Sequence, residues 1–122
     1  MTDPYFDRQD QLDKITGNLL PEETIIAVYD CIGVGTGFIG VTNRRIILQD
    51  NSFVGGKVAL TSIPYGKIQS LSFCSDKSMF GKFASSSSIA LITSGKVYEA
   101  TFRTIEKAKH IHDVALHYLF LS

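Results

Sequence analysis

The sequence lacks an excess of charge of either sign. Lysine and arginine together number 12, and aspartate and glutamate also number 12, so the formal net charge of the 122 residues is zero. A neutral chain has no strong long-range attraction for nucleic acid or for an anionic membrane, so any anion site must be a local cluster. We therefore expect no nucleic-acid partner. With 44% hydrophobic and 20% charged residues, the chain should fold around one domain-sized core.

Cysteine is scarce, and long hydrophobic runs are missing. Cys31 and Cys74 lie far apart, and all three histidines fall near the C-terminus, so the sequence does not indicate a cysteine–histidine nucleophile. We interpret both cysteines as buried structural thiols. No apolar run approaches the ~20 residues that cross a bilayer, and residues 1–4 lack the basic start of a signal peptide. These absences predict a cytoplasmic protein with reduced thiols, no catalytic machinery and no cofactor.

Two amphipathic helices are predicted, one at each end of the chain. Asp3 as N-cap and Pro4 at the first helical position start the N-terminal helix, and residues 17–18 with Pro21 stop it, so residues 1–21 form a helical extension. Its apolar side, which should pack on the sheet or on a partner, consists of Tyr5, Leu12, Ile15 and Leu19. A second helix begins at Ile105, where the hydrophobic period becomes helical, and should cover a sheet.

Between the helices, short runs of β-branched and aromatic residues alternate with turns. The strand candidates are residues 24–29, 38–41, 45–48, 57–60, 70–74, 89–92 and 97–103. About seven antiparallel strands closed by one amphipathic helix predict a mostly β (α+β) fold, a partly open barrel or sandwich that spans residues 22–122.

Two motifs resemble a known family. Residues 41–48, Val-Thr-Asn-Arg-Arg-Ile-Ile-Leu, are followed by residues 63–68, Ile-Pro-Tyr-Gly-Lys-Ile. With the strand order, they resemble the bacterial pleckstrin-homology-like (PH-like) domains. The resemblance implies seven strands capped by a C-terminal helix and symmetric homo-oligomers, including rings, but no assigned ligand. The first hairpin loop, residues 31–38, contains no basic residue, so inositol-phosphate binding of the kind known from other pleckstrin domains is not expected there.

Two patterns suggest chemistry that their context does not support. Residues 35–40 match G-x-G-x-x-G, but a strand rather than a helix should follow, so we predict a glycine-rich hairpin and not a nucleotide site. On the last helix Glu106, His110, Asp113 and His117 form one polar stripe. His110 and His117 would lie about 10 Å apart along the helix axis, too far to share one metal ion. We interpret the stripe as a solvated face.

Arg44 and Arg45 are adjacent at a turn and should point to opposite faces of a strand. One interpretation is that one arginine pairs with turn carbonyls or with a carboxylate such as Asp50 while the other is solvated. The alternative is an anion site that combines either arginine with Lys57 and Lys67.

Residues 76–88 combine apolar and basic side chains in a predicted loop. Met79, Phe80 and Phe83 could insert at a membrane interface with Lys77 and Lys82 on phosphates. They could instead form a subunit contact, or fold back into the core.

The sequence therefore predicts a non-enzymatic PH-like module. We expect it to form homo-oligomers and to bind an unidentified protein through edge strands, the N-terminal helix and residues 79–83. The alternative is a peripheral binder of anionic lipid or of a phosphorylated ligand, whose basic residues would be Lys77, Lys82, Arg44, Arg45 and Lys67.

Overall fold

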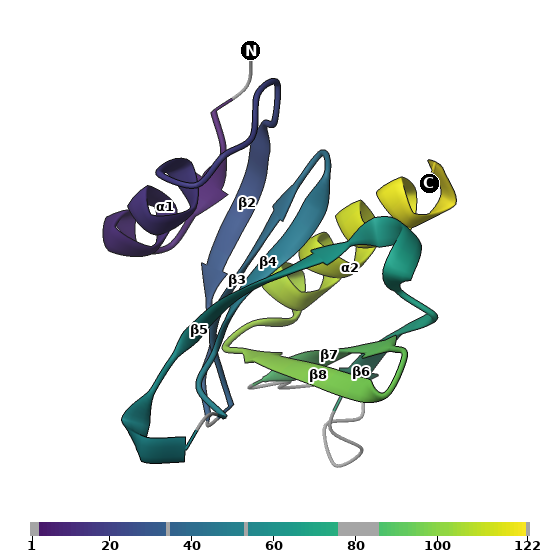
Figure 1. Cartoon of the computed structure of the whole chain (residues 1–122). Coiled ribbons are helices and arrows are strands. Elements are labelled where there is room, and N and C mark those ends of the chain that lie inside the picture. The colour runs from purple at the N-terminus through teal and green to yellow at the C-terminus, as the bar shows by residue number, and fades with distance from the viewer. Residues whose placement is uncertain (1–2, 34, 53, 76–85, 122) are drawn as a thin grey trace.

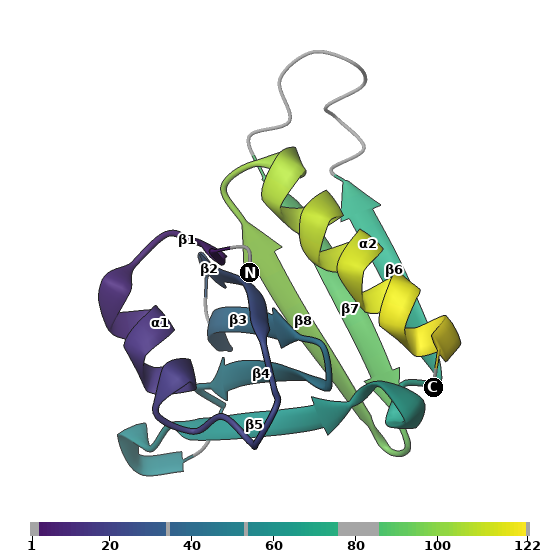
Figure 2. The same ribbon diagram turned by 90° about the horizontal axis from the view of Figure 1, so that it is seen from above.

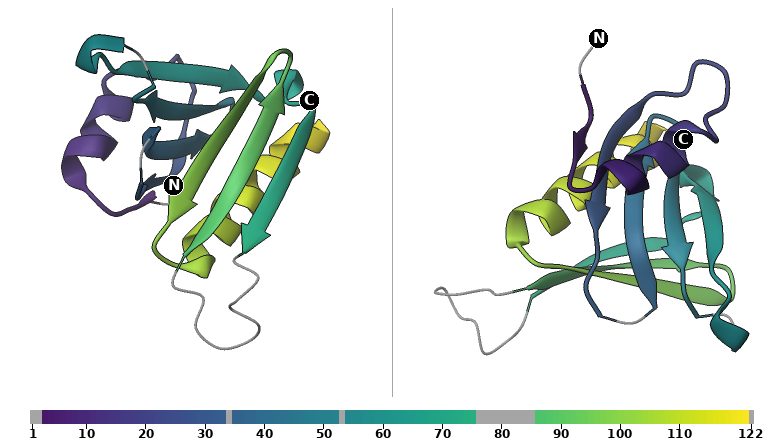
Figure 3. Two further views of the ribbon diagram at one scale, coloured as in Figure 1. Left: turned by 90° about the horizontal axis from the view of Figure 1, so that it is seen from below. Right: turned by 90° about the vertical axis from the view of Figure 1, so that its left-hand side faces the viewer.

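Eight strands and two helices make up the described residues of the chain. The computed structural model describes residues 3–33, 35–52, 54–75 and 86–121 (Figure 1). A five-stranded sheet has the order β1-β2-β3-β4-β5, and a three-stranded sheet has the order β6-β7-β8. The elements are β1 (Tyr5–Phe6), α1 (Gln9–Thr16), β2 (Ile25–Asp30), β3 (Thr36–Thr42), β4 (Arg45–Asp50), β5 (Ala59–Pro64), β6 (Ser70–Ser75), β7 (Ser87–Thr93), β8 (Lys96–Phe102) and α2 (Ile105–Leu121), with short 3₁₀ turns at Val54–Gly56 and Tyr65–Lys67. Strands of the two sheets cross at a large angle (Figure 3).

The main core lies between the two sheets and α2. Alternating residues of β7 and β8 point inward, so that Ile89, Leu91, Ala100 and Phe102 are buried. Helix α2 lies along β6 and β7 and closes the open side of the sheets (Figure 2). It buries Ala108, Ile111 and Ala115, whose spacing of three and four residues is that of one helix face. The predicted partly open sandwich with a helical cover is thereby confirmed.

A second, smaller core lies under α1 on the other face of the five-stranded sheet. Ile15 is fully buried and packs with Val28, Phe38 and Ile47. Gly40 on β3 makes this approach possible, because a Cβ atom there would collide with the Ile15 side chain. The glycine-rich run at residues 35–40 therefore leads into strand β3, and its last glycine gives α1 room to dock. This agrees with the predicted glycine-rich hairpin.

The predicted start of the N-terminal helix is wrong. Tyr5 and Phe6 instead form β1, which pairs in parallel with β2, and α1 begins at Gln9. The Asp7 backbone N–H donates to the Val28 carbonyl at 3.2 Å, and the Asp7 carboxylate accepts from the Asp30 N–H at 3.0 Å. Pairing with β2 thus overrides the local capping signal at the N-terminus. The predicted stop is confirmed, since Gly17 is the C-cap of α1.

Candidate functional site

The first signature motif folds into a hydrogen-bonded turn between β3 and β4. The Thr42 hydroxyl accepts hydrogen bonds from the backbone N–H groups of Arg44 and Arg45, each at 3.0 Å. The same hydroxyl donates to Oε2 of Glu23 at 2.7 Å. Asn43 receives a bond on Oδ1 from the backbone N–H of Thr24 at 2.8 Å. The motif thereby connects the turn to the segment that enters β2.

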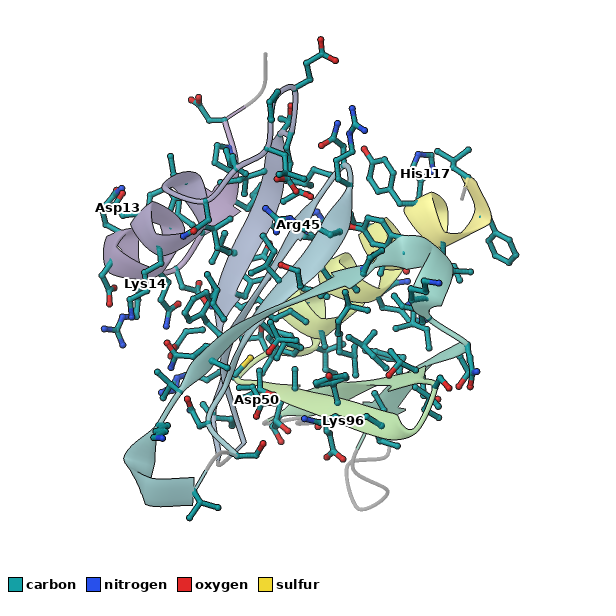
Figure 4. The ribbon with its side chains drawn as sticks, in the orientation of Figure 1. Asp13, Lys14, Arg45, Asp50, Lys96 and His117 are labelled. Atoms are coloured by element: carbon teal, nitrogen blue, oxygen red, sulfur yellow. The ribbon has the colours of Figure 1, made fainter. Side chains whose placement is uncertain are left out.

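Arg45, labelled in Figure 4, forms a bidentate ion pair with the buried carboxylate of Glu23 in this network. Arg45 Nε lies 2.8 Å from Glu23 Oε2, and Arg45 Nη2 lies 2.9 Å from Oε1. The Arg45 hydrogen bonds lower the pKa of Glu23 to about 2, although burial opposes this shift. The predicted pairing of one arginine with a carboxylate is confirmed in kind, but the partner is Glu23 and not Asp50. Arg45 also donates to Ser62 Oγ at 2.7 Å and to the Asn18 carbonyl at 2.8 Å, so most of its donors are used within the fold, and anion binding by Arg45 stays a prediction.

The second signature motif contacts the first. The Tyr65 hydroxyl donates to the Thr42 carbonyl at 2.6 Å, and the Tyr65 ring stacks on Tyr118 of α2 with centroids 5.4 Å apart. Burial raises the pKa of Tyr65 well above its usual range, so the hydroxyl stays a donor. Ile63 and Ile68 of this motif are buried in the main core. The two motifs together hold the β3–β4 turn, the turn after β5 and α2 in one arrangement.

The other predicted binding residues fall into two groups. Arg44, Lys57 and Lys67 are exposed. Met79, Phe80, Phe83, Lys77 and Lys82 lie outside the described residues. Binding of an anionic lipid or of a phosphorylated ligand through these residues stays a prediction.

Asp50 lies in a polar cleft between the two sheets. Its carboxylate is nearly buried and pairs with Lys96 Nζ at 3.0 Å, so that a residue of β4 holds a residue of β8 (Figure 4). Lys96 also lies 4.7 Å from the centre of the Tyr98 ring. The cleft has a volume of about 360 Å³, and Thr36 on its wall donates to the Glu99 carbonyl at 2.7 Å. These contacts join the sheets at their open end, and we interpret them as structural.

The histidine stripe is not uniformly solvated, which corrects the prediction. His110 is half-buried, and its Nδ1 lies 2.7 Å from the Tyr29 hydroxyl. The Tyr5 ring meets the same histidine edge-on at 5.0 Å. Burial raises the pKa of Tyr29 to about 12. Within the described parts of the chain, no three His, Cys, Asp or Glu side chains are grouped to hold a metal ion.

The two cysteines differ. Cys31 is buried, and this burial raises the pKa of its thiol to about 12, as expected of a structural thiol. Cys74 is exposed on β6, so the prediction of a buried thiol is wrong at that position. Strand β6 is an edge strand, and Cys74 points away from the core while Leu71 packs against it.

Strand β5 forms an open edge, as Pro64 at its end suggests, but Val58 and Leu60 on it are not among the binding residues predicted from the sequence. It ends the five-stranded sheet, and no other strand of the described residues pairs with its outer side. Val58 and Leu60 are 60% and 42% exposed, and they border a groove of about 270 Å³ beside Lys14 and Asn18 of the α1 region. The available signal was period two, which places Val58 and Leu60 on the face opposite the buried Ile63.

Comparison with known proteins agrees with this architecture. A model of the family described as bacterial PH domain matches residues 19–114. A pleckstrin homology domain from Shewanella amazonensis SB2B is 23% identical, with a TM-score of 0.63 over 90% of this chain and 99% of that chain. A DUF1696 family protein with a pleckstrin-homology domain from Shewanella loihica PV-4 is 21% identical, with a TM-score of 0.62 over 93% of this chain and 94% of that chain.

At 23% and 21% sequence identity, the likeness to these two structures shows a shared fold and nothing more. Among curated proteins, no match is found. None of the helices in the described residues is long and apolar enough to span a membrane. The family match, which covers both signature motifs, β2 to β8 and the first part of α2, confirms the expected resemblance. The chain belongs to the bacterial PH domain family.

Proposed function

We propose that the chain is a non-catalytic binding module that associates with a second copy of itself through the outer edge of β5. PH-like domains generally act as binding modules and not as enzymes. The observation that carries the proposal is the open β5 edge with its exposed Val58 and Leu60. Exposed strand edges are templates for pairing with another chain.

Strand β5 has little of the protection that edge strands usually carry. No charged residue occurs between Val58 and Gly66, the β4–β5 register runs without a bulge, and only Pro64 interrupts the edge at its end. Charges, prolines and bulges are the common devices that keep edges from pairing. Their scarcity along six residues supports pairing as the use of this edge.

The neutral edge also favours a second copy as the partner. In a two-fold interface, residues near the axis face their own counterparts, so a single charge there would meet a like charge. An axis at Leu60 sets this side chain opposite the partner's Leu60, and the apolar side chains of both copies then cover one another. The groove beside α1 would be closed from the same side.

Sedimentation velocity at micromolar concentration tests the proposal. We expect the wild-type chain to be at least a dimer and the Leu60→Lys variant to be a monomer, because the lysines would repel across the axis. Val97→Lys is the matched control, since Val97 on β8 is also an exposed strand residue, 58% accessible. It should associate as the wild type does. A strictly monomeric wild-type chain would contradict the proposal.

A further inference from the structure

A small cavity where β2 and β8 end and α2 begins is lined by charged side chains alone. Its volume is about 230 Å³, and its lining residues are Asp7, Arg8, Asp30, Arg103 and Lys107. They come from four segments: the β1–α1 connection, the end of β2, the residue after β8 and the first turn of α2. None of the signature-motif residues lines it.

The cavity holds one lysine in a fixed position. Lys107 Nζ lies 2.7 Å from Oδ1 of Asp7, and Oδ2 of Asp7 accepts from the backbone N–H of Asp30 at 3.0 Å. The carboxylate is thereby anchored to the end of β2. An ammonium group has three N–H donors, and Asp7 takes one of them. Lys107 therefore keeps donors for a ligand.

Two arginines complete the positive side of the cavity. Arg103 is exposed and makes no hydrogen bond or ion pair with the described residues. Arg8 pairs with Asp10, but both side chains are more than half exposed, and such pairs contribute little and open readily. Three cations against the two lining carboxylates give a net charge of 3 − 2 = +1.

The lining carboxylates are already engaged within the chain. Asp30 accepts from Gln11 Nε2 at 2.7 Å, and Asp7 is held by Lys107 and the Asp30 N–H. Their lone pairs are therefore partly satisfied, while the donors of Arg103 are not. The cavity therefore has more free hydrogen-bond donors than free acceptors, which suits a ligand group that only accepts hydrogen bonds.

We propose that this cavity binds a phosphate group carried by a small molecule or a lipid headgroup. The planar guanidinium of Arg103 can bind two phosphate oxygens, and Lys107 can donate to a third. Arg8, which also lines the cavity, adds a further positive charge once it leaves Asp10. The start of α2 contributes a weak positive potential on the same side.

The test uses two probes that share the phosphate and differ in its source. Glycerol phosphate is titrated while the backbone amide shifts of residues 103–107 are followed by NMR. Phosphatidylcholine vesicles with and without phosphatidic acid are used in cosedimentation. Arg103→Glu should weaken binding at least about tenfold, because a charged hydrogen bond is lost and a repulsion is gained. Lys109→Glu makes the same charge change at an exposed residue of α2 that does not line the cavity, and should weaken binding less than about twofold.

The outcomes separate cleanly. Binding of glycerol phosphate indicates a soluble ligand. Binding only to vesicles with phosphatidic acid indicates a lipid headgroup. Either result supports the site when the Arg103→Glu substitution removes the binding. Arg103→Gln, which removes the charge alone, gives the same prediction should the Glu variant fail to fold. Absence of binding to both probes, or equal losses in the Arg103→Glu and Lys109→Glu variants, overturns the proposal.

Discussion

The β3–β4 turn and the β5 edge lie at neighbouring parts of one sheet, yet they use their polar groups in opposite ways. At the turn, Thr42 and Arg45 form several hydrogen bonds each, all within the chain. Along β5, the outer backbone groups have no partner among the described strands. The first signature motif therefore consists of residues that stabilise the fold. The backbone groups that are available for pairing lie beside it, on the outer edge of β5.

The largest expected effect comes from breaking the turn. Arg45→Ala leaves the Glu23 carboxylate buried without its cation, and we expect the free energy of unfolding to fall by about 3–5 kcal/mol. Urea denaturation measures this loss. Arg44→Ala, at the exposed neighbour, should change stability by less than about 0.5 kcal/mol. Similar losses in the two variants would contradict the assignment of Arg45 to the fold.

Acid should break the same pair. The pKa of Glu23 falls from 4.5 to about 2 on folding, so the stabilisation is complete above the unfolded pKa and is lost as the pH drops from about 4.5 to about 2. At ~1.4 kcal/mol per pKa unit, this amounts to about 3 kcal/mol. Denaturation curves at several pH values should show a smaller slope in this window for Glu23→Gln. An unchanged slope would show that other carboxylates cause the acid sensitivity.

A smaller effect is expected where the two motifs meet. Tyr65→Phe removes the donor to the Thr42 carbonyl but keeps the ring on Tyr118, and should cost about 1–2 kcal/mol. Tyr98→Phe is the matched control, because the Tyr98 hydroxyl makes no hydrogen bond in the part of the chain that the structure describes. Thermal denaturation of the two variants compares them directly. Equal melting temperatures of the two variants would show that the hydrogen bond between Tyr65 and Thr42 does not contribute to stability.

The smallest change in stability is expected at the open edge. Leu60→Ser, at a 42% exposed position, should alter the free energy of unfolding of the monomer by less than about 0.5 kcal/mol. Association should weaken nonetheless, so the melting temperature of this variant should depend less on protein concentration than that of the wild type. A large loss in dilute solution would show that Leu60 supports the fold itself.

Sequence patterns predicted the elements whose signals are local. Period two located β6 and β8, and helical periodicity located α2 from Ile105. The start of α1 could not be found in this way, because the pairing of Tyr5 and Phe6 with β2 depends on residues about 20 positions away. The contacts of Arg45 likewise depend on residues that are distant in the sequence. The sequence suggested Asp50 as a partner of Arg45, and Glu23 could not be identified instead without knowing which segments meet beside the β3–β4 turn.

Gly40 has a consequence for the evolution of this family. Since Ile15 occupies the space that a side chain at position 40 would need, the helix and the glycine form one unit although 25 residues separate them (40 − 15). A relative without an N-terminal helix would have no such restriction, and a larger residue on that strand would then be expected. Co-occurrence of this glycine with an N-terminal helix across homologues would thus identify the members that share this arrangement from sequence alone.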